Sequence, residues 1–355
     1  MENIKFTIII ICWNNKKFLE DCLNSVKEQV YKKYEVILSD NNSNDGSVEF
    51  VKKNYKFVKI IENGKNYGFA EGNNIAMRQA VKKNDTDYIF ILNPDTVMDK
   101  YCLKFLAESI ENNDDFKVGC YVPKLKVLGK ENKISAAGGD CILRCGDNLS
   151  RAFYYDDDGS YDEERLVFGP SGAAAVYSLD MIKKIGFYDK HLFTYYEDVD
   201  YNIRMQRMTW KAKYVPKSLV YHFHSGTLDD FNPFKTYLLN RNKLYVILKN
   251  YPAILFKKYF KDIIRSFGAF TLYCFRNNYK FIWLKIIFFQ IYSLPIILYR
   301  RLEMNFQLKK KEKKDVLESI DRIYYYIEEH EELMSSEKRL LAVQEYLNDI
   351  KNRDI

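Results

Sequence analysis

The chain has 355 residues, of which 47% are hydrophobic and 29% charged, a composition that excludes an intrinsically disordered protein and allows one large domain with an extension. Its net charge of +7 is uneven: residues 235–314 hold 18 Lys and Arg but three acids, so this segment carries +15 and the remainder −8. The seven cysteines are scattered, which favours reduced thiols in a cytosolic protein over a disulfide framework or a zinc site. The first residues lack the basic start and cleavage site of a signal peptide.

Strands and helices are expected to alternate over the first 100 residues. Continuous apolar runs predict strands buried on both faces, and apolar residues at helical spacing predict the helices between them. The predicted strands are 6–12, 34–38, 58–61 and 87–92, and the predicted helices are 18–29, 48–53 and 71–83. This alternation predicts a doubly wound, Rossmann-like α/β domain, which binds its ligands at the carboxyl ends of the strands.

The pattern is looser from 112 to 168, where we expect a loop-rich insertion with short strands. A helix starting near Glu197 and a strand over 213–224 restore the order. We therefore expect a catalytic domain over 1–230.

The carboxyl-terminal third is expected to be helical. Residues 231–305 are basic and aromatic, and their longest uncharged apolar stretch, 286–299, is too short for a confident transmembrane helix. Residues 306–355 predict a charged helical hairpin or coiled coil, a possible surface for a homo-oligomer. Its two apolar stripes are Val316, Ile320, Ile323 and Ile327, then Leu340, Val343, Leu347 and Ile350.

Three features fall at predicted strand ends, where ligands bind. Asp40 can accept hydrogen bonds from a ribose or a base, and the loop 66–74 precedes a helix, so its backbone N–H groups can face a phosphate. Asp95 can hold a divalent cation through a carboxylate oxygen. Each residue could instead serve only a turn, so their occurrence together at one edge of the sheet is the stronger signal.

A second group of polar residues suits proton transfer and further metal ligation. Glu197 and Asp198 are adjacent acids that can raise each other's pKa, which suits a general base. His222 and His224 point to the same face of a predicted strand. One of these histidines could complete a metal site, or both could be polar residues at a strand end.

Together these residues resemble the family 2 glycosyltransferases of the GT-A fold, most closely the rhamnosyltransferase-like members that build bacterial capsules and O-antigens. The similarity covers about 6–252 and includes the turn 39–43, the loop 66–74 and the segment 93–96, a degenerate Asp-x-Asp motif. Asn93 stands where many relatives have a second acid.

The resemblance implies a role for each matching residue. Asp198, with Glu197, is the catalytic base; Asn14, Asp40, Asn66, Gly68, Gly72 and Asn73 bind the donor nucleotide; Gly172, Ala173 and Asp200 contact the donor sugar or acceptor; Asp95, His222 and His224 bind the metal.

The implied reaction is an inverting transfer from a nucleoside-diphosphate sugar, with Mn²⁺ or Mg²⁺, to a hydroxyl of a glycan or polyprenyl-diphosphate-linked acceptor. The basic, aromatic segment 231–305 suits an anionic membrane surface, at the cytoplasmic inner face of the plasma membrane, or a helical subdomain packed on the core.

Two other functions each fit part of the sequence. A sugar-nucleotide pyrophosphorylase would carry a Gly-rich, basic first loop, and Cys12-Trp13-Asn14-Asn15 has no Gly. A nucleic-acid-binding protein would leave the acids at the strand ends without a role, so no nucleic-acid partner is expected.

Overall fold

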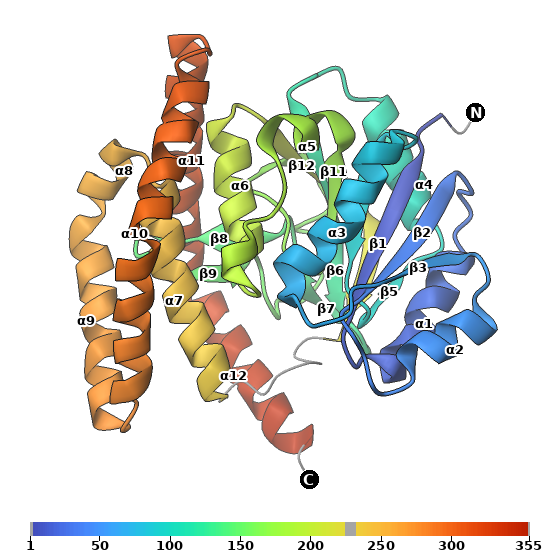
Figure 1. Ribbon diagram of the computed structural model, residues 1–355, viewed down its shortest axis with the longest axis horizontal. Helices are drawn as coiled ribbons and strands as arrows, with labels where there is room; N and C mark the ends of the chain where they lie inside the picture. Colours follow the sequence, from blue (N-terminus) through green and yellow to red (C-terminus); the bar gives the residue numbers. More distant parts are fainter. Residues whose placement is uncertain (1–2, 224–231, 354–355) are drawn as a thin grey trace.

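The computed structural model describes residues 3–223 and 232–353. A mixed sheet lies at its centre, with strand order β10-β12-β6-β11-β4-β1-β2-β3, while β5 pairs with β12 and β7 with β6 (Figure 1). The strands are β1 (Phe6–Cys12), β2 (Tyr34–Asp40), β3 (Val58–Glu62), β4 (Tyr88–Leu92), β5 (Thr96–Met98), β6 (Val118–Val127), β7 (Lys130–Ala136), β8 (Asp140–Ile142), β9 (Asn148–Ser150), β10 (Arg165–Val167), β11 (Ala174–Ser178) and β12 (Lys211–His222).

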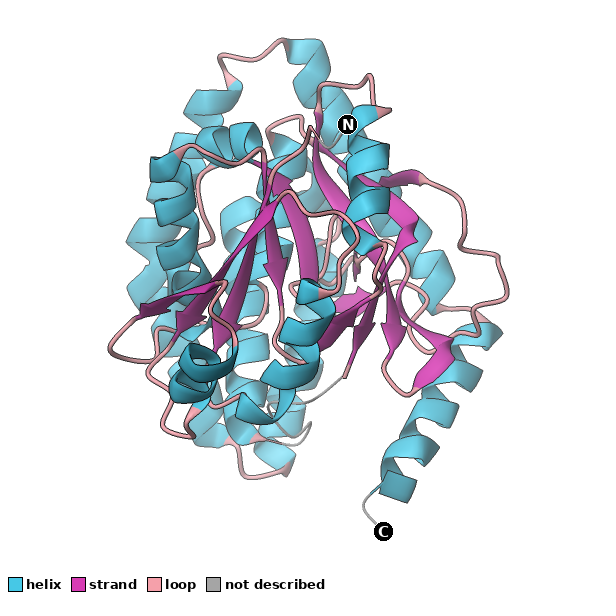
Figure 2. Cartoon of the chain, turned by 90° about the vertical axis from the view of Figure 1, so that its right-hand side faces the viewer, coloured by secondary structure: helices cyan, strands magenta, loops and turns pink. Residues whose placement is uncertain are grey.

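Helices cover both faces of this sheet (Figure 2). In β1, Ile8 and Ile10 join a core with the residues of α1 and α4, whereas Ile9 joins the core under α3 and α5. The helices of this domain are α1 (Lys16–Lys27), α2 (Ser47–Asn54), α3 (Gly68–Lys83), α4 (Cys102–Glu111), α5 (Leu179–Ile185), the short 3₁₀ turn η1 (Lys190–Leu192) and α6 (Glu197–Arg207). The strands β1 to β4 are parallel, and β11 joins antiparallel, so the expected doubly wound α/β domain is confirmed.

The insertion over 112–168 contains the expected short strands β8, β9 and β10, of three residues each, but it also holds a long one. It contributes β6, ten residues long, which lies inside the main sheet between β11 and β12. The polar Lys124 obscures this strand in the sequence, yet it is buried because Asp157 binds its ammonium at 2.8 Å. A buried charge with a partner from a distant loop cannot be recognised from periodicity.

The chain after 231 forms six helices within the described residues. They are α7 (Pro233–Asn250), α8 (Ala253–Lys258), α9 (Phe260–Arg276), α10 (Lys280–Leu308), α11 (Lys313–Met334) and α12 (Glu337–Arg353). One buried cluster joins Tyr196, Val199 and Ile203 of the catalytic domain to Tyr245 of α7 and Ile327 of α11. The expected boundary at 230 therefore divides residues that share one core.

The expected hairpin of the last two helices is wrong. Figure 1 shows α12 running on from α11 toward the carboxyl terminus instead of folding back on it. The first stripe is used within the chain, since Ile323 and Ile327 are buried beside α6. In the second stripe Leu340 and Leu347 are exposed, and α12 packs instead through Tyr346, whose ring lies 4.8 Å from that of Phe153.

Helix α10 is longer than the sequence suggested. It spans 29 residues and continues through Pro295. It is the one helix of the described part that is long and apolar enough to cross a membrane by length and composition, with a mean hydropathy of 1.9 over its most apolar window.

Candidate active site

A cleft of about 900 Å³ opens at the carboxyl ends of the central strands. Its walls come from Trp13 after β1, Asn41 after β2, the segment 93–95 after β4, and the loop 193–196 before α6. Helix α7 completes the wall with Phe234, Leu239, Asn240 and Lys243. The cleft is therefore built from both the α/β domain and the helical extension.

The structure brings eight of the expected site residues together at this cleft. They are Asn66, Gly68, Asp95, Gly172, Ala173, Glu197, Asp198 and His222. A side chain at Gly68 would meet the carbonyl oxygen of Phe193 at 2.3 Å, and the φ of this glycine is +74°. Glycine at this position thus lets the loop 66–74 approach the loop before α6.

Four expected donor-binding residues support the cleft without lining it. Asp40 accepts hydrogen bonds from the backbone N and the Oγ of Ser43, at 3.0 and 2.6 Å, and so closes a turn. Asn14 accepts one from the N of Asn44 at 2.9 Å. Gly72 packs against β1 and the fully buried Asn73 donates to Phe69 O, so both serve the local packing of α3.

Asn41 occupies the position that was expected of Asp40. It lines the cleft, and its Nδ2 donates to the carbonyl of Gly68 at 3.0 Å. This hydrogen bond ties the end of β2 to the loop 66–74.

Asp200, expected to contact the sugar or acceptor, is fully buried away from the cleft. Its carboxylate pairs with Arg204 at 2.9 Å and with Lys249 at 2.5 Å. Lys249 also binds Asp189 at 2.5 Å, and the expected role is replaced by an ion-pair network between α6 and α7.

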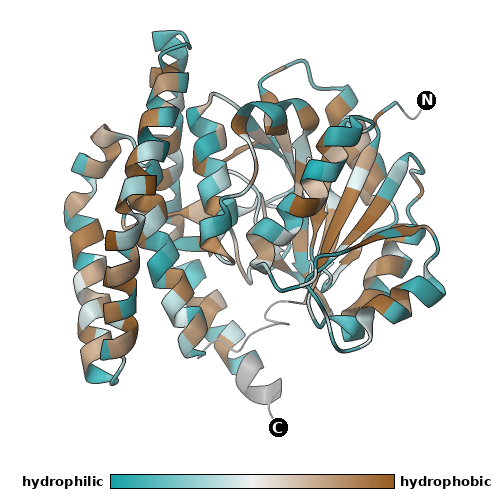
Figure 3. Cartoon of the chain, viewed as in Figure 1, coloured by the Kyte–Doolittle hydropathy of each residue, from teal (hydrophilic) through white to brown (hydrophobic). Residues whose placement is uncertain are grey.

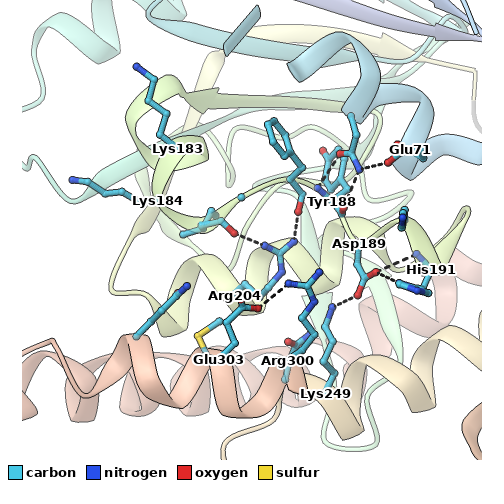
Figure 4. A pocket seen from close by; sticks show the side chains of 18 of the residues that line it. Glu71, Lys183, Lys184, Tyr188, Asp189, His191, Arg204, Lys249, Arg300 and Glu303 are labelled. Carbon is cyan, nitrogen blue, oxygen red and sulfur yellow. Dashed lines mark hydrogen bonds and ion pairs between the residues drawn. The ribbon is translucent and has the colours of Figure 1, made fainter. Parts of the chain in front are cut away.

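This network borders a second cavity, of about 450 Å³, between α3, α6 and α10 (Figure 4). Figure 4 shows Asp189 between His191 and Lys249. Burial opposes ionisation of Asp189, but the charge of Lys249 and the hydrogen bonds from His191 outweigh it and lower its pKa. The positively charged side chains at the centre of this cavity are thus paired with acidic side chains of the same chain.

Asp95 and His222 lie at adjacent strand ends. Residue 222 of β12 pairs with residue 96 of β5, which places the Nε2 of His222 3.6 Å from the Oδ1 of Asp95. The neighbouring Oδ1 of Asn93 is buried and has no hydrogen-bond partner within the described chain. Within 3–223 and 232–353 no group of three His, Cys, Asp or Glu side chains gathers, here or elsewhere, and His224 lies outside those residues.

The oxygens of Asn93 and Asp95 with the imidazole of His222 fit a divalent cation that takes oxygen and nitrogen ligands. The remaining coordination positions would fall to a bound ligand and water.

The carboxylate of Asp198 is fixed at the first turn of α6. Its Oδ2 accepts a hydrogen bond from the N of Gly172 at 2.9 Å, and its Oδ1 accepts one from the N of Val199 at 2.8 Å. Burial raises its pKa, although these bonds and a hydrogen bond with Asp140 act in the opposite direction. Burial and the charge of Asp198 also raise the pKa of Glu197 well above its usual range.

Asp140 was not identified from the sequence. It is buried on β8, its Oδ2 accepts from Asn148 at 3.3 Å, and burial together with Asp198 raises its pKa well above the usual range. Asp140 therefore holds a proton that it can share with Asp198. The preceding Gly138-Gly139 was the available signal, because a side chain at Gly139 would meet the oxygen of Gly169 at 2.1 Å.

Asn242 of α7 was also missed, and it fixes the loop before Asp198. Phe193, Tyr195 and Tyr196 have φ values of 66°, 68° and 68°, which non-glycine residues rarely adopt. The buried Nδ2 of Asn242 lies 2.9, 2.9 and 2.7 Å from the carbonyl oxygens of Leu192, Thr194 and Tyr195. On the other side of the loop, the N of Ala70 donates to the oxygen of Phe193 at 3.0 Å.

Asp140→Asn is expected to stabilise the protein more as the pH rises. The native Asp140 keeps its proton to a higher pH than in the unfolded chain, so folding free energy is lost above the unfolded pKa of about 4. Asparagine removes this loss and can still donate to Asp198. Urea unfolding at a series of pH values should show a gain over wild type that grows from pH ~4 to pH ~7. Asp114→Asn, at an exposed position, is the control, and a gain independent of pH would contradict the assignment.

Comparisons with known proteins bear on the family and the fold of the chain. The family model described as "Glycosyl transferase family 2" matches residues 7–186. Poly-beta-1,6-N-acetyl-D-glucosamine synthase of Staphylococcus epidermidis is 24% identical over 226 residues, covering 62% of this chain and 49% of the relative. The enzyme of the same name from Staphylococcus aureus is 23% identical over 233 residues, covering 62% and 50%. The chain thus spans about half the length of the curated relatives it matches.

Two solved structures share the fold. The structure of GalNAc-T7 with UDP, GalNAc and Mn²⁺ has a TM-score of 0.55 at 17% identity and covers 70% of this chain and 48% of its own. The structure of S. aureus TarS 1–349 with UDP has a TM-score of 0.53 at 17% identity and covers 90% of both chains. With half of its length matched by the family model, and with this fold, the chain belongs to glycosyltransferase family 2.

Proposed function

We propose that the chain transfers a sugar from a nucleoside-diphosphate sugar to a hydroxyl acceptor, with inversion at the anomeric carbon. One observation carries the proposal: the fixed, high-pKa carboxylate of Asp198 lies in the same cleft as the strand-end pair Asp95 and His222. The bound UDP of the two structures that share this fold supports a nucleotide donor.

In the proposed reaction, Asp198 takes the proton of the acceptor hydroxyl while that oxygen attacks the anomeric carbon. The new carbon–oxygen bond forms opposite the breaking bond to the diphosphate, which leaves with the bonding electrons. Asn66 and Gly68 line the cleft and would contact the donor, and Gly172 holds the base with its backbone N–H. The raised pKa of Asp198 suits a base that works near neutral pH.

Asp198→Asn should abolish transfer and leave nucleotide binding nearly intact. The amide keeps the shape but cannot accept the proton, and loss of a general base costs ~10²–10⁴ in rate. A screen of nucleotide sugars for transfer or hydrolysis tests the function, with release of nucleoside diphosphate as the readout. Wild-type inactivity against all donors would contradict the proposed reaction, and near-normal turnover by the variant would exclude Asp198 as the base.

We infer that the reaction uses Mn²⁺ or Mg²⁺, held by Asp95 and His222, with Asn93 as a neutral further ligand. A cation bound there would offset charge that develops on the leaving diphosphate. The unpartnered oxygen of Asn93 supports the assignment, as does the Mn²⁺ in the structure of GalNAc-T7. His224 remains a candidate from the sequence.

Asp95→Ala should weaken binding of a nucleoside diphosphate in Mn²⁺ much more than binding of the bare nucleoside. Asp95 reaches the diphosphate only through the cation, so the loss should disappear in EDTA. Isothermal calorimetry of both ligands, with and without EDTA, measures this difference. Asp99→Ala, which removes a carboxylate after β5 outside the cleft, is the matched control. Equal affinities of Asp95→Ala and wild type in Mn²⁺ would remove Asp95 from the metal site.

The proposed acceptor is a glycan linked to a polyprenyl diphosphate at the inner face of the plasma membrane. Helices α9 and α10 support this location because they lie together at one side of the molecule and consist largely of apolar residues (Figure 3). Exposed side chains on these helices include Ile264, Leu272, Phe275, Ile291, Leu294, Leu298 and Leu302. Lys and Arg are interspersed among them, a pattern that suits the interface of an anionic bilayer.

Leu272→Ser should weaken co-sedimentation with anionic phospholipid vesicles. This side chain is 59% exposed on α9, and its burial in lipid would be lost. Binding of the wild type should fall with added salt without vanishing, because apolar burial is not screened. Leu317→Ser, on α11 and 52% exposed, is the control. Full-length protein that ignores anionic vesicles at low salt would contradict the membrane location.

A further inference from the structure

An apolar groove of about 730 Å³ lies between the start of α7 and one face of α10. Pro233, Phe234 and Tyr237 form its α7 side. Its α10 side consists of Phe281, Ile282, Leu284, Lys285, Phe288, Phe289 and Tyr292. Phe288 and Tyr292 are 73% and 76% exposed, so the described chain leaves this groove open.

The floor of the groove is held in place by polar contacts beneath it. The Nε2 of Gln290 donates to the carbonyl oxygen of Arg241 at 2.8 Å, which fixes α10 to α7. The guanidinium of Arg241 lies 4.4 Å from the ring centre of Phe289 and 5.4 Å from that of Tyr237. Arg241 also donates to the carbonyl of Leu192 at 2.6 Å, so the groove and the catalytic loop share an anchor.

The groove adjoins the catalytic cleft at Phe234. Phe234 lines both cavities. Its ring lies 6.4 Å from that of Phe193, which lines the cleft, and 6.5 Å from that of Tyr237, which lines the groove. A row of three aromatic rings therefore leads from the catalytic loop to the groove.

Cations lie along this passage. Lys243 lines the cleft, and Lys285 lines the groove with its ammonium 4.6 Å from the ring centre of Phe281. The ammonium of Lys235 lies 5.9 Å from the ring centre of Tyr195, at the same end of α7. Lys243 also pairs with Asp147 of the cleft at 2.8 Å, and Lys285 is the one cationic side chain among the described residues that line the otherwise apolar groove.

A polar cleft, the neighbouring cations and the adjoining apolar groove together fit an amphiphile with a polar reacting end, an anionic linker and a long apolar tail. We propose that the groove between α7 and α10 binds the first part of the prenyl tail of the lipid-linked acceptor and so directs the acceptor hydroxyl toward Asp198. The inference rests on the proposed transfer to a lipid-linked acceptor. It adds a site for the tail that is distinct from the bulk membrane contact of α9 and α10.

The test compares two acceptors with the same sugar diphosphate, one on a short water-soluble alkyl chain and one on a long prenyl chain. Phe288→Ser removes an aromatic ring from the groove. Phe306→Ser is the matched control, because Phe306 is 62% exposed on the same helix outside the groove. Phe288→Ser should lower kcat/KM about tenfold for the long-chain acceptor, mainly through KM, and leave the short-chain acceptor unchanged. Phe306→Ser should change neither.

Equal losses in the two variants, or a loss with both acceptors, would overturn the tail site. If the wild type turns over neither acceptor, the proposed reaction fails, and a binding experiment still tests the groove. A long-chain prenyl phosphate with a photoreactive tail should then label residues 281–292 of full-length wild type in detergent micelles. Labelling should fall in Phe288→Ser but not in Phe306→Ser. Labelling that is spread over both α9 and α10, or that excess phospholipid displaces, would show that this face contacts only bulk lipid.

Discussion

The left-handed backbone between Leu192 and Glu197 is the constraint on which the active site depends. Each non-glycine residue in this conformation costs on the order of 1–3 kcal/mol, so the loop persists only because its surroundings hold it. Asn242 of α7 donates to carbonyl oxygens of this loop, and the backbone N of Ala70, in the segment 66–74, donates to another. Because α6 begins directly after this loop, the same contacts set the position of Asp198 relative to both substrates.

Three carboxyl groups crowd beside this loop, and their burial decides how they are charged. Asp140, Glu197 and Asp198 all have raised pKa values, and burial is the largest cause in each case. Hydrogen bonds from the backbone of Gly172 and Val199 favour the ionised form at Asp198 alone. The site thus concentrates negative charge on one carboxylate while its neighbours keep their protons, a division of roles typical of paired acids in enzymes.

The sequence predicted the elements whose signals are local. The four parallel strands appear as short, mainly apolar runs, and Asp95, Gly68 and Asp198 follow turns with a recognisable composition. It could not predict Asn242, and for Asp140 it offered only the indirect signal of Gly138-Gly139, because the carbonyls that Asn242 binds lie 47–50 positions away and Asp198 lies 58 positions from Asp140. The stripe on α12 misled for a related reason: this helix packs through the contact of Tyr346 with Phe153, a residue distant in the sequence, while Leu340 and Leu347 stay exposed.

Because α6 and α7 share one core, this core also limits where the chain can be recombined with a relative to form a chimera. A chimera joined at residue 230, between the last strand and the first helix of the extension, would replace Asn242 and Lys249 and leave the carbonyls of Leu192 and Thr194 and the buried Asp200 without their partners. A junction after Asn250, before α8, keeps these contacts within one parent. Recombination among relatives, in nature or by design, is therefore compatible with a working active site only when α7 travels with the α/β domain.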